Sequence, residues 1–82
     1  MSVTDKARAV MKMAGIKGVD LAAALGVSYN AASNRMYKGI KSVDDLVKIV
    51  TACGATLSIT TKDGTTIPLT LADLEEPSKG EQ

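Results

Sequence analysis

Glycines divide the first two thirds of the chain into four short segments, each with the apolar spacing of an amphipathic helix. Ser2 with Asp5, and Ser42 with Asp45, resemble the capping boxes that begin a helix. The spacing predicts helices over about 2–14, 18–25, 28–38 and 42–53, followed by Gly15, Gly26, Gly39 and Gly54. The fourth helix is expected to carry Val43, Leu46, Val47, Ile49, Val50 and Cys53 inward.

From residue 55 the apolar period changes from 3.6 to 2, which indicates two half-buried strands. The turn between them lies within 62–64, a Lys-Asp-Gly run. A two-residue loop would mix apolar and polar positions on each face of the hairpin. A three-residue loop with its glycine in the left-handed bulge position instead pairs Ile59 with Ile67 and Leu57 with Leu69, and we predict that register.

The length of 82 residues leaves room for one small core. The predicted fold class is mainly α with a C-terminal β-hairpin of two antiparallel strands. Thr70 with Asp73 is expected to cap one more helical turn around 71–75, ended by Pro77. We therefore expect a helical domain over 1–54, the hairpin and short turn over 55–76, and a flexible, solvated tail over 77–82.

Composition argues against an enzyme and against a metal or cofactor site. The chain has no histidine, the commonest general base and metal ligand, and its single cysteine provides neither a disulfide framework nor a thiolate metal site. Cys53 lies on an apolar helical stripe, which favours a small buried hydrophobe over a redox sensor. Adjacent acids such as Asp44 and Asp45 point about 100° apart on a helix, so capping and the helix dipole explain them better than catalysis.

The sequence also carries no sign of membrane insertion. No apolar run approaches the ~20 residues of a membrane span. The first residues lead into an amphipathic stretch rather than into the hydrophobic region of a signal peptide. We therefore expect a cytoplasmic chain that makes no membrane contact.

Charge is divided unevenly along a chain whose formal net charge is +1. Residues 1–41 hold seven cations and two anions, a net charge of +5, whereas residues 42–82 hold three cations and seven anions, a net charge of −4. Such a division indicates a basic face for a polyanion and an acidic face turned elsewhere. The alternative is chance segregation of solvated charges.

The segment 21–36 contains the residues that a tight turn between two packed helices requires. A small residue, Ala22, stands where the helices meet, and Gly26 tolerates the left-handed backbone of the turn. Val27 supplies an apolar plug, and Ser28 supplies a cap for the next helix. This packing holds the second helix out from the body, where its N-terminal half can enter a major groove about 12 Å wide.

The pattern Leu-Ala-x-x-Leu-Gly-Val-Ser at 21–28, followed by a helix and Gly39, resembles the Cro/repressor-type (xenobiotic-response-element-like) helix-turn-helix family of small phage and bacterial transcriptional regulators. The resemblance covers about 3–54 and implies a four-helix, lambda-repressor-like domain. It implies a homodimer that inserts the third helix of each copy into double-stranded DNA at a palindromic operator, as a repressor of its own or a neighbouring operon. Ala32 stands where members often carry a large aliphatic residue, so we expect the third helix closer to the core or at a shifted angle.

Ala32 and Met36, four residues apart, are expected to face inward and so to define the outer face of the third helix. In resembling proteins the base-reading side chains come from the start of this helix and from one turn later. Those positions here are Ser28, Tyr29, Asn30, Ser33 and Asn34. An asparagine amide can bond adenine bidentately, a serine can donate or accept, and a tyrosine ring can contact a thymine methyl. The alternatives are ordinary surface polarity for the asparagines and partial core packing for the tyrosines.

Phosphate contacts are expected from the helix ends that flank the third helix, where the helix dipole at an N-terminus also favours an anion. In the usual docking of this motif, the start of the second helix faces the DNA backbone. The expected phosphate-contacting set is Lys17, Gly18, Arg35, Tyr37, Lys38, Lys41 and Ser42. For each lysine alone, a role in solubility is the alternative.

One recognition helix covers only a few base pairs, so an operator requires two copies on half-sites about 34 Å apart. The hairpin is the candidate interface because a lone two-stranded hairpin is marginal in water and its edges are free to pair. Pro68 cannot donate a ladder bond, so the strand over 55–61 is the expected pairing edge. The expected interface residues are Leu57, Ile59, Ile67, Leu69 and Leu71. The alternative is a monomer whose hairpin covers the first and fourth helices.

Two other functions remain open beside sequence-specific regulation. A protein-binding module on the same fold, such as an antitoxin or a small phage inhibitor, would use this surface for a protein partner. A non-specific architectural DNA protein is disfavoured, because +5 is a modest charge for binding driven by phosphate neutralisation alone.

Overall fold

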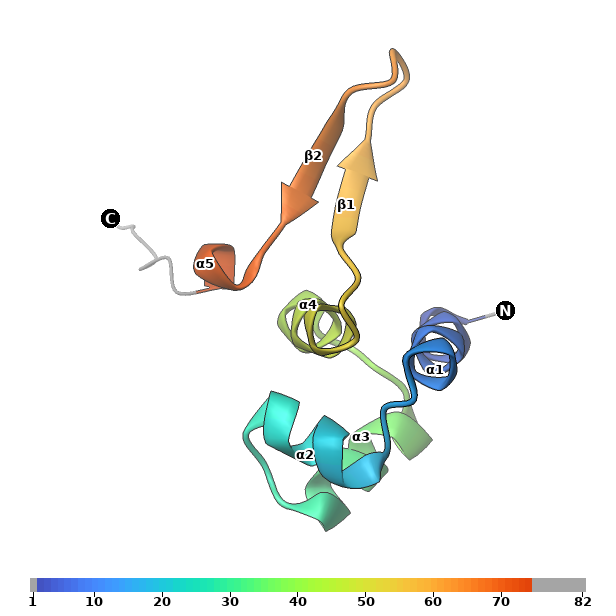
Figure 1. Cartoon of the computed structure of the whole chain (residues 1–82), viewed down its shortest axis with the longest axis vertical. Helices are drawn as coiled ribbons and strands as arrows, with labels where there is room; N and C mark the ends of the chain where they lie inside the picture. Colours follow the sequence, from blue (N-terminus) through green and yellow to red (C-terminus); the bar gives the residue numbers. More distant parts are fainter. Residues whose placement is uncertain (1, 75–82) are drawn as a thin grey trace.

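The structure, a computed structural model, describes residues 2–74. This part of the chain is mainly helical, with a two-stranded antiparallel sheet toward its C-terminal end, as the sequence predicts (Figure 1). The elements are α1 (Val3–Ala14), α2 (Gly18–Leu25), α3 (Tyr29–Lys38), α4 (Val43–Ala52), β1 (Leu57–Thr60), β2 (Thr66–Leu69) and α5 (Leu71–Leu74). The expected tail over 77–82, together with the expected helix end at Glu75–Pro77, lies outside the described residues.

Local capping sets the helix boundaries. The Asp5 N–H donates to Ser2 Oγ at 3.0 Å and the Ser2 N–H donates to Asp5 Oδ2 at 3.3 Å, which is the predicted capping box of α1. Gly15 ends this helix with φ at 73°, a left-handed conformation that favours glycine. One cap was not predicted, since the Lys17 N–H that precedes α2 donates to Asp20 Oδ2 at 3.0 Å.

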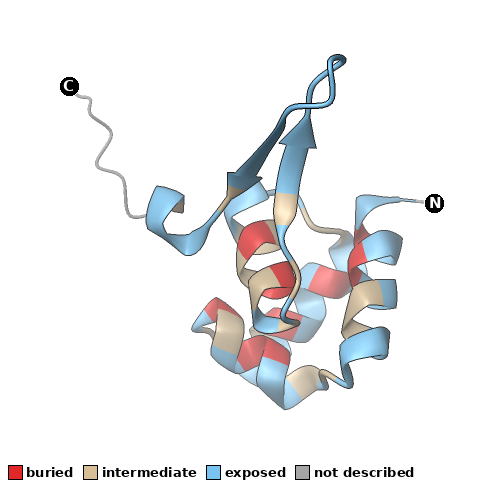
Figure 2. Ribbon diagram, turned by 45° about the horizontal axis from the view of Figure 1, so that its top comes forward, coloured by how far each residue is buried: buried red, intermediate tan, exposed pale blue. Residues whose placement is uncertain are grey.

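The core lies where the first four helices meet, and each of them contributes buried apolar residues. Figure 2 shows the buried positions on these helices in red. It comprises Ala7, Leu21, Ala22, Leu25, Ala32, Met36, Val47, Ile49 and Val50. The prediction that Ala32 and Met36 face inward is confirmed, because their exposed fractions are 1% and 8%. The prediction that Val43 points inward is wrong: as the first residue of α4 it lies at an open helix end and is 60% exposed.

Two polar contacts tie α1 to the connection between α3 and α4. The buried hydroxyl oxygen of Thr4 accepts the Ile40 N–H at 2.8 Å, and Arg8 Nη2 donates to the Met36 carbonyl at 3.0 Å. The Ile40 N–H and the Met36 carbonyl would otherwise lack a protein partner in a part-buried region, where an unmade hydrogen bond costs about 1–3 kcal/mol. These contacts fix the C-terminal end of α3 relative to α1.

The hairpin has the predicted register, with Ile59 opposite Ile67 and Leu57 opposite Leu69. The predicted three-residue loop over 62–64 is confirmed, since the Thr61 N–H donates to the Thr65 carbonyl at 2.8 Å and Gly64 has φ at 94°. The strands are shorter than the expected 55–61 segment because pairing is limited to residues 57–60 and 66–69.

Asp63 closes the hairpin loop through its carboxylate. It accepts hydrogen bonds from the Thr61 hydroxyl and from the Thr65 N–H. These hydrogen bonds hold the pKa of the Asp63 carboxyl below its ordinary value, because they stabilise the ionised form. The charged aspartate is therefore part of the loop structure.

The hairpin stands out from the helical body instead of lying across it. Figure 1 shows β1 and β2 at one end of the molecule and α2 and α3 at the other, with α1 and α4 between them. The base of the hairpin packs on α4, and Leu57 and Leu69 there are half-buried. Farther out, Ile59 is 53% and Ile67 is 50% exposed. The hairpin therefore does not cover α1 and α4 in the way that the monomer alternative requires.

After β2 the chain returns to the helical body through α5. Thr70 and Asp73 are paired as predicted, but with Asp73 as the acceptor: its carboxylate accepts the Thr70 N–H at 2.7 Å and the Thr70 hydroxyl at 3.1 Å. Leu71 remains 44% exposed, and Leu74 is half-buried beside α4.

Candidate nucleic-acid interface

The α2–α3 unit is closed by a three-residue connection, Gly26 to Ser28. Gly26 has φ at 70°, and the Val27 N–H donates back to the Ala22 carbonyl at 3.1 Å. Val27 is half-buried and packs against the core. The Ala31 N–H donates to Ser28 Oγ at 3.1 Å and so caps α3. Each feature that the sequence suggested for a tight turn between packed helices is present.

The outer face of α3 is polar and carries no charge from Tyr29 to Asn34. Four predicted base-contacting residues of the helix, Tyr29, Asn30, Ser33 and Asn34, are all exposed. The predicted Ser28 is exposed as well, but its oxygen already accepts the cap hydrogen bond, which leaves its hydroxyl hydrogen to donate. Their helical spacing places Tyr29, Asn30, Ser33 and Asn34 on one face of α3, with Ser28 at its start. The helix itself lies at the end of the molecule opposite the hairpin (Figure 1).

The two tyrosines of α3 have different surroundings. Tyr37 is 86% exposed, so the suggestion that it packs in the core is wrong. Tyr29 is 55% exposed and its ring lies against the first residue of α2. A Cβ atom at Gly18 would lie 2.5 Å from Tyr29 Cε1, which is closer than real carbon atoms approach. Gly18 thus has a steric role that the sequence did not reveal: because it has no side chain, the Tyr29 ring can pack against it.

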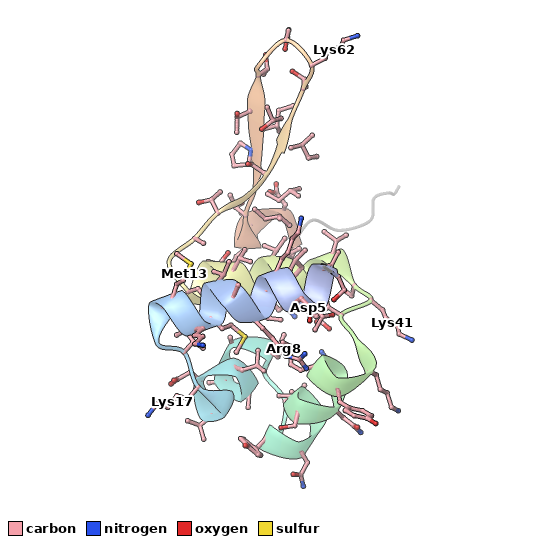
Figure 3. The ribbon with its side chains drawn as sticks, turned by 90° about the vertical axis from the view of Figure 1, so that its right-hand side faces the viewer. Asp5, Arg8, Met13, Lys17, Lys41 and Lys62 are labelled. Carbon is pink, nitrogen blue, oxygen red and sulfur yellow. The ribbon has the colours of Figure 1, made fainter. Side chains whose placement is uncertain are left out.

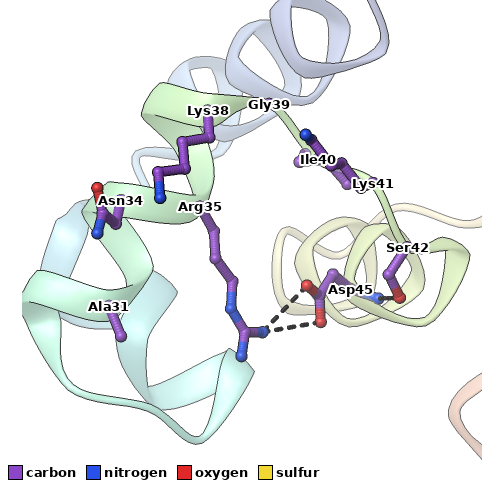
Figure 4. Close-up of a pocket in the computed structure, with 9 residues that line it drawn as sticks. All are labelled: Ala31, Asn34, Arg35, Lys38, Gly39, Ile40, Lys41, Ser42 and Asp45. Atoms are coloured by element: carbon purple, nitrogen blue, oxygen red, sulfur yellow. Dashed lines mark hydrogen bonds and ion pairs between the residues drawn. The ribbon is translucent and has the colours of Figure 1, made fainter.

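Basic side chains lie on both sides of the α2–α3 unit. Figure 3 shows Lys17 on one side of this unit and Lys41 on the other. Lys38 and Lys41 border a cleft of about 410 Å³ between the end of α3 and the start of α4 (Figure 4). The cleft is lined by Ala31, Asn34, Arg35, Lys38, Gly39, Ile40, Lys41, Ser42 and Asp45.

Arg35 is already paired with a carboxylate in this cleft. Its Nη1 donates to Asp45 Oδ1 at 3.1 Å and to Asp45 Oδ2 at 3.0 Å (Figure 4). The Arg35 side chain is 43% exposed and that of Asp45 is 18% exposed, so the arginine covers the aspartate. Among residues 2–74, Arg35 Nε and Nη2 make no hydrogen bond. Sequence reasoning assigned Arg35 to phosphate and missed Asp45, because nothing in the sequence links positions ten apart across a turn.

Ser42 is also used by the fold. The Asp45 N–H donates to Ser42 Oγ at 3.2 Å, which caps α4 as predicted. The Ser42 hydroxyl itself donates no hydrogen bond within the described part of the chain. Lys17, Lys38 and Lys41 are exposed and make no ion pair with the residues that the structure describes.

Cys53 caps the end of α4 and lines a shallow apolar pocket with Val10 and Ala55. Burial raises the pKa of its thiol, so the thiol stays protonated near neutral pH. It is half-buried, less than the fully buried position expected for it. Within residues 2–74, no cluster of three or more histidine, cysteine or acidic side chains is placed to bind a metal ion.

Comparison with family models, with curated proteins and with solved structures finds no match to this chain. In the described part of the chain, none of the helices has the length and apolar character needed to cross a membrane. The function is therefore inferred from the residues of α2, α3 and their flanks.

Proposed function

We propose that this protein is a sequence-specific DNA-binding regulator of the helix-turn-helix type, which inserts α3 into the major groove. The observation that carries the proposal is the composition of one surface. α3 presents uncharged hydrogen-bonding side chains outward, while cationic side chains lie on both sides of the α2–α3 unit. A protein that reads bases between two phosphate backbones needs this arrangement.

The chemistry of α3 favours contacts to A·T base pairs. Asn30 and Asn34 are one helical turn apart and exposed, so both amides can reach base edges from the same side of the helix. An asparagine amide matches the N6 and N7 groups of adenine, and the Tyr29 ring can contact a thymine methyl. The first half of α3 contains no arginine or lysine to bind guanine bidentately.

Lys17 and Lys41 serve as phosphate contacts on opposite sides of the groove. Their separation across the α2–α3 unit in Figure 3 suits two backbones, one on each side of an inserted helix. The N–H groups that begin α2 at Gly18, and Lys38 beside the cleft, add to this set. Arg35 contributes less than a free arginine, because Asp45 balances its charge.

The protein acts as a homodimer at a palindromic operator and represses the gene that the operator controls. α3 has ten residues, so one copy contacts only a few base pairs. The apolar face of the hairpin is available for a second copy, since Ile59 and Ile67 are about half exposed. A dimer bound at a promoter would hinder transcription by occupying the DNA.

A gel-shift assay with the DNA upstream of the gene, titrated with salt, tests the proposal. Asn30→Ala and Asn34→Ala should each cost about 1–3 kcal/mol on the bound sequence and little on random DNA. Met13→Gln, which alters an 87% exposed side chain on α1, should change neither.

Two outcomes would contradict this function. Equal losses of affinity for the bound sequence and for random DNA would show that the asparagines contact phosphates and not bases. That result would contradict base reading by α3. A chain that shifts no DNA at low salt would instead favour the protein-binding alternative, in which the same exposed surface of α3 meets a protein partner.

A further inference from the structure

The direction of the hairpin restricts how two copies can meet. The hairpin and α3 lie at opposite ends of the longest axis of the molecule, which is 36 Å (Figure 1). In Figure 3 the hairpin rises straight from the layer formed by α1 and α4, away from α2 and α3. A contact made through the hairpin therefore also fixes where the two copies of α3 point.

Both copies of α3 must face the same DNA if the proposed function holds. The two-fold axis of such a dimer runs from the DNA into the protein, and so approximately from α3 toward the hairpin. The two hairpins then point in the same direction, away from the DNA. Two β1 strands related by this axis run parallel to each other.

Edge pairing of β1 with its copy is incompatible with this axis. An antiparallel ladder needs the two hairpins to point in opposite directions, which would turn the two copies of α3 away from each other. A parallel ladder needs the two strands to be offset, whereas an exact two-fold axis sets each N–H at the same height as its own copy. The pairing edge predicted from the sequence, 55–61, therefore does not suit a dimer that binds one DNA.

The hairpin has one apolar face that is suited to a different contact. The register places Leu57, Ile59, Ile67 and Leu69 on the same side of the two strands. At the outer end of this face Ile59 and Ile67 lie opposite each other and are about half exposed. A two-stranded hairpin is marginal in water unless this face is covered. The helix α4 covers its base at Leu57 and Leu69, but nothing in the described part of the same chain covers Ile59 and Ile67 at its outer end.

We propose that a second copy of this chain covers the face, with the two hairpins packed face to face and Ile59 and Ile67 at the centre. This inference rests on the proposed function, because the shared DNA sets the direction of the two-fold axis. Sheets packed in this way lie about 10 Å apart with their strands within about 30° of each other. The other face of the hairpin, which carries Ser58, Thr60, Thr66 and Pro68, remains toward solvent.

Matched variants in β1 separate face packing from edge pairing. Since the Thr61 N–H bonds Thr65, ladder alternation directs the Ser58 N–H outward, as at its partner Pro68, which has no N–H. Ser58→Pro therefore blocks the free edge without removing a bond inside the hairpin. Ile59→Lys alters the apolar face, and Thr60→Lys adds the same charge to the opposite face.

The masses of these variants in solution, measured by light scattering at micromolar concentration, give the first result. The wild type, Ser58→Pro and Thr60→Lys should have twice the chain mass of 8.5 kDa, and Ile59→Lys should have the mass of one chain. Circular dichroism checks that each variant keeps its helices. A monomeric wild type, a monomeric Ser58→Pro or a dimeric Ile59→Lys would overturn the proposal.

The distance between the two hairpin tips gives a second result. A spin label at Lys62→Cys, in a Cys53→Ala background that remains dimeric, lies at the tip of the hairpin (Figure 3). Face-to-face hairpins hold the two tip backbones about 10 Å apart, the spacing of packed sheets. An antiparallel edge pair centred on Ile59 would separate the two labelled positions, each three residues from Ile59, by about 20 Å, at ~3.4 Å per residue.

These measurements need no DNA, so they fail independently of the proposed function. A face-to-face dimer that binds no DNA would contradict DNA binding and leave the interface in place. Labels about 20 Å apart in a chain that does bind an operator would contradict the interface alone.

Discussion

Replacing Asp45 by asparagine should strengthen binding of the protein to DNA of any sequence and make that binding more sensitive to salt. Arg35 Nη1 lies 3.1 Å and 3.0 Å from the two carboxylate oxygens of Asp45, in the cleft that Lys38 also lines. Asparagine keeps the size of the side chain and one oxygen acceptor but removes the negative charge. Arg35 then becomes free to pair with a phosphate.

The size of the effect follows from the number of phosphates gained. Each phosphate neutralised contributes about 0.9 to the slope of log K against log salt concentration. One additional contact from Arg35 therefore makes this slope more negative by about 0.9. The advantage of the variant over the wild type should fall about 3.5-fold between 50 and 200 mM salt. The free energy of unfolding should fall by less than about 1 kcal/mol, because the Arg35 side chain is 43% exposed and solvent screens the pair.

Fluorescence anisotropy with labelled DNA at several salt concentrations measures these slopes. Asp44→Asn is the matched control, since it removes the same charge from the same helical turn. Asp44 lines a different cleft, with Ala24 and Leu71, and makes no ion pair within residues 2–74. The control should leave the slope unchanged. A slope for Asp45→Asn equal to that of Asp44→Asn would show that the ion pair does not withhold Arg35 from phosphate.

Two further predictions concern the Tyr29 ring and the hairpin loop. Gly18→Ala would place a Cβ atom 2.5 Å from Tyr29 Cε1, so the half-exposed ring must move. The midpoint of thermal unfolding should change little, because the ring can move into solvent. Fluorescence anisotropy should show weaker binding to the operator. Unchanged operator affinity would mean that the position of the ring does not matter for binding. The pKa of Asp63 is lower in the folded protein than in the unfolded chain, so its ionised carboxylate stabilises the fold. This stabilisation is complete at neutral pH, and it is lost as the pH falls below about 4, the ordinary pKa of an aspartate, and on through the folded pKa. Amide NMR signals of Thr65 followed from pH 6 to 2 should shift over that acid range, and Asp63→Asn should remove the shift.

Features of the fold that depend on neighbouring residues could be predicted from the sequence. The cap at Ser2, the left-handed turn at Gly26 and the three-residue hairpin loop each depend on residues within four positions of one another. The register of β1 and β2 followed because a shift by one residue would mix the two faces.

Contacts between distant residues could not be predicted in the same way. The Arg35–Asp45 pair, the Thr4–Ile40 hydrogen bond and the packing of Tyr29 on Gly18 depend on how the helices cross. Val43 has the apolar spacing of a core position, but as the first residue of α4 it is 60% exposed.

The direction of the hairpin was likewise not contained in its alternating pattern. Alternation of apolar and polar residues identifies which face of the hairpin is apolar, but it does not say where that face points. Only the structure shows the hairpin standing away from α3 (Figure 1), and this direction replaces the expected edge contact with a face contact in our proposal.

Selection of binding sites from a randomised DNA library tests sequence-specific DNA binding most directly. The purified chain should enrich one sequence with two inverted half-sites whose centres lie about 34 Å apart, rich in A·T pairs where Asn30 and Asn34 meet the bases. Asn30→Ala should enrich a sequence that is relaxed at the position it contacts. Recovery of DNA without any enriched sequence, at every salt concentration that permits binding, would contradict base reading by α3.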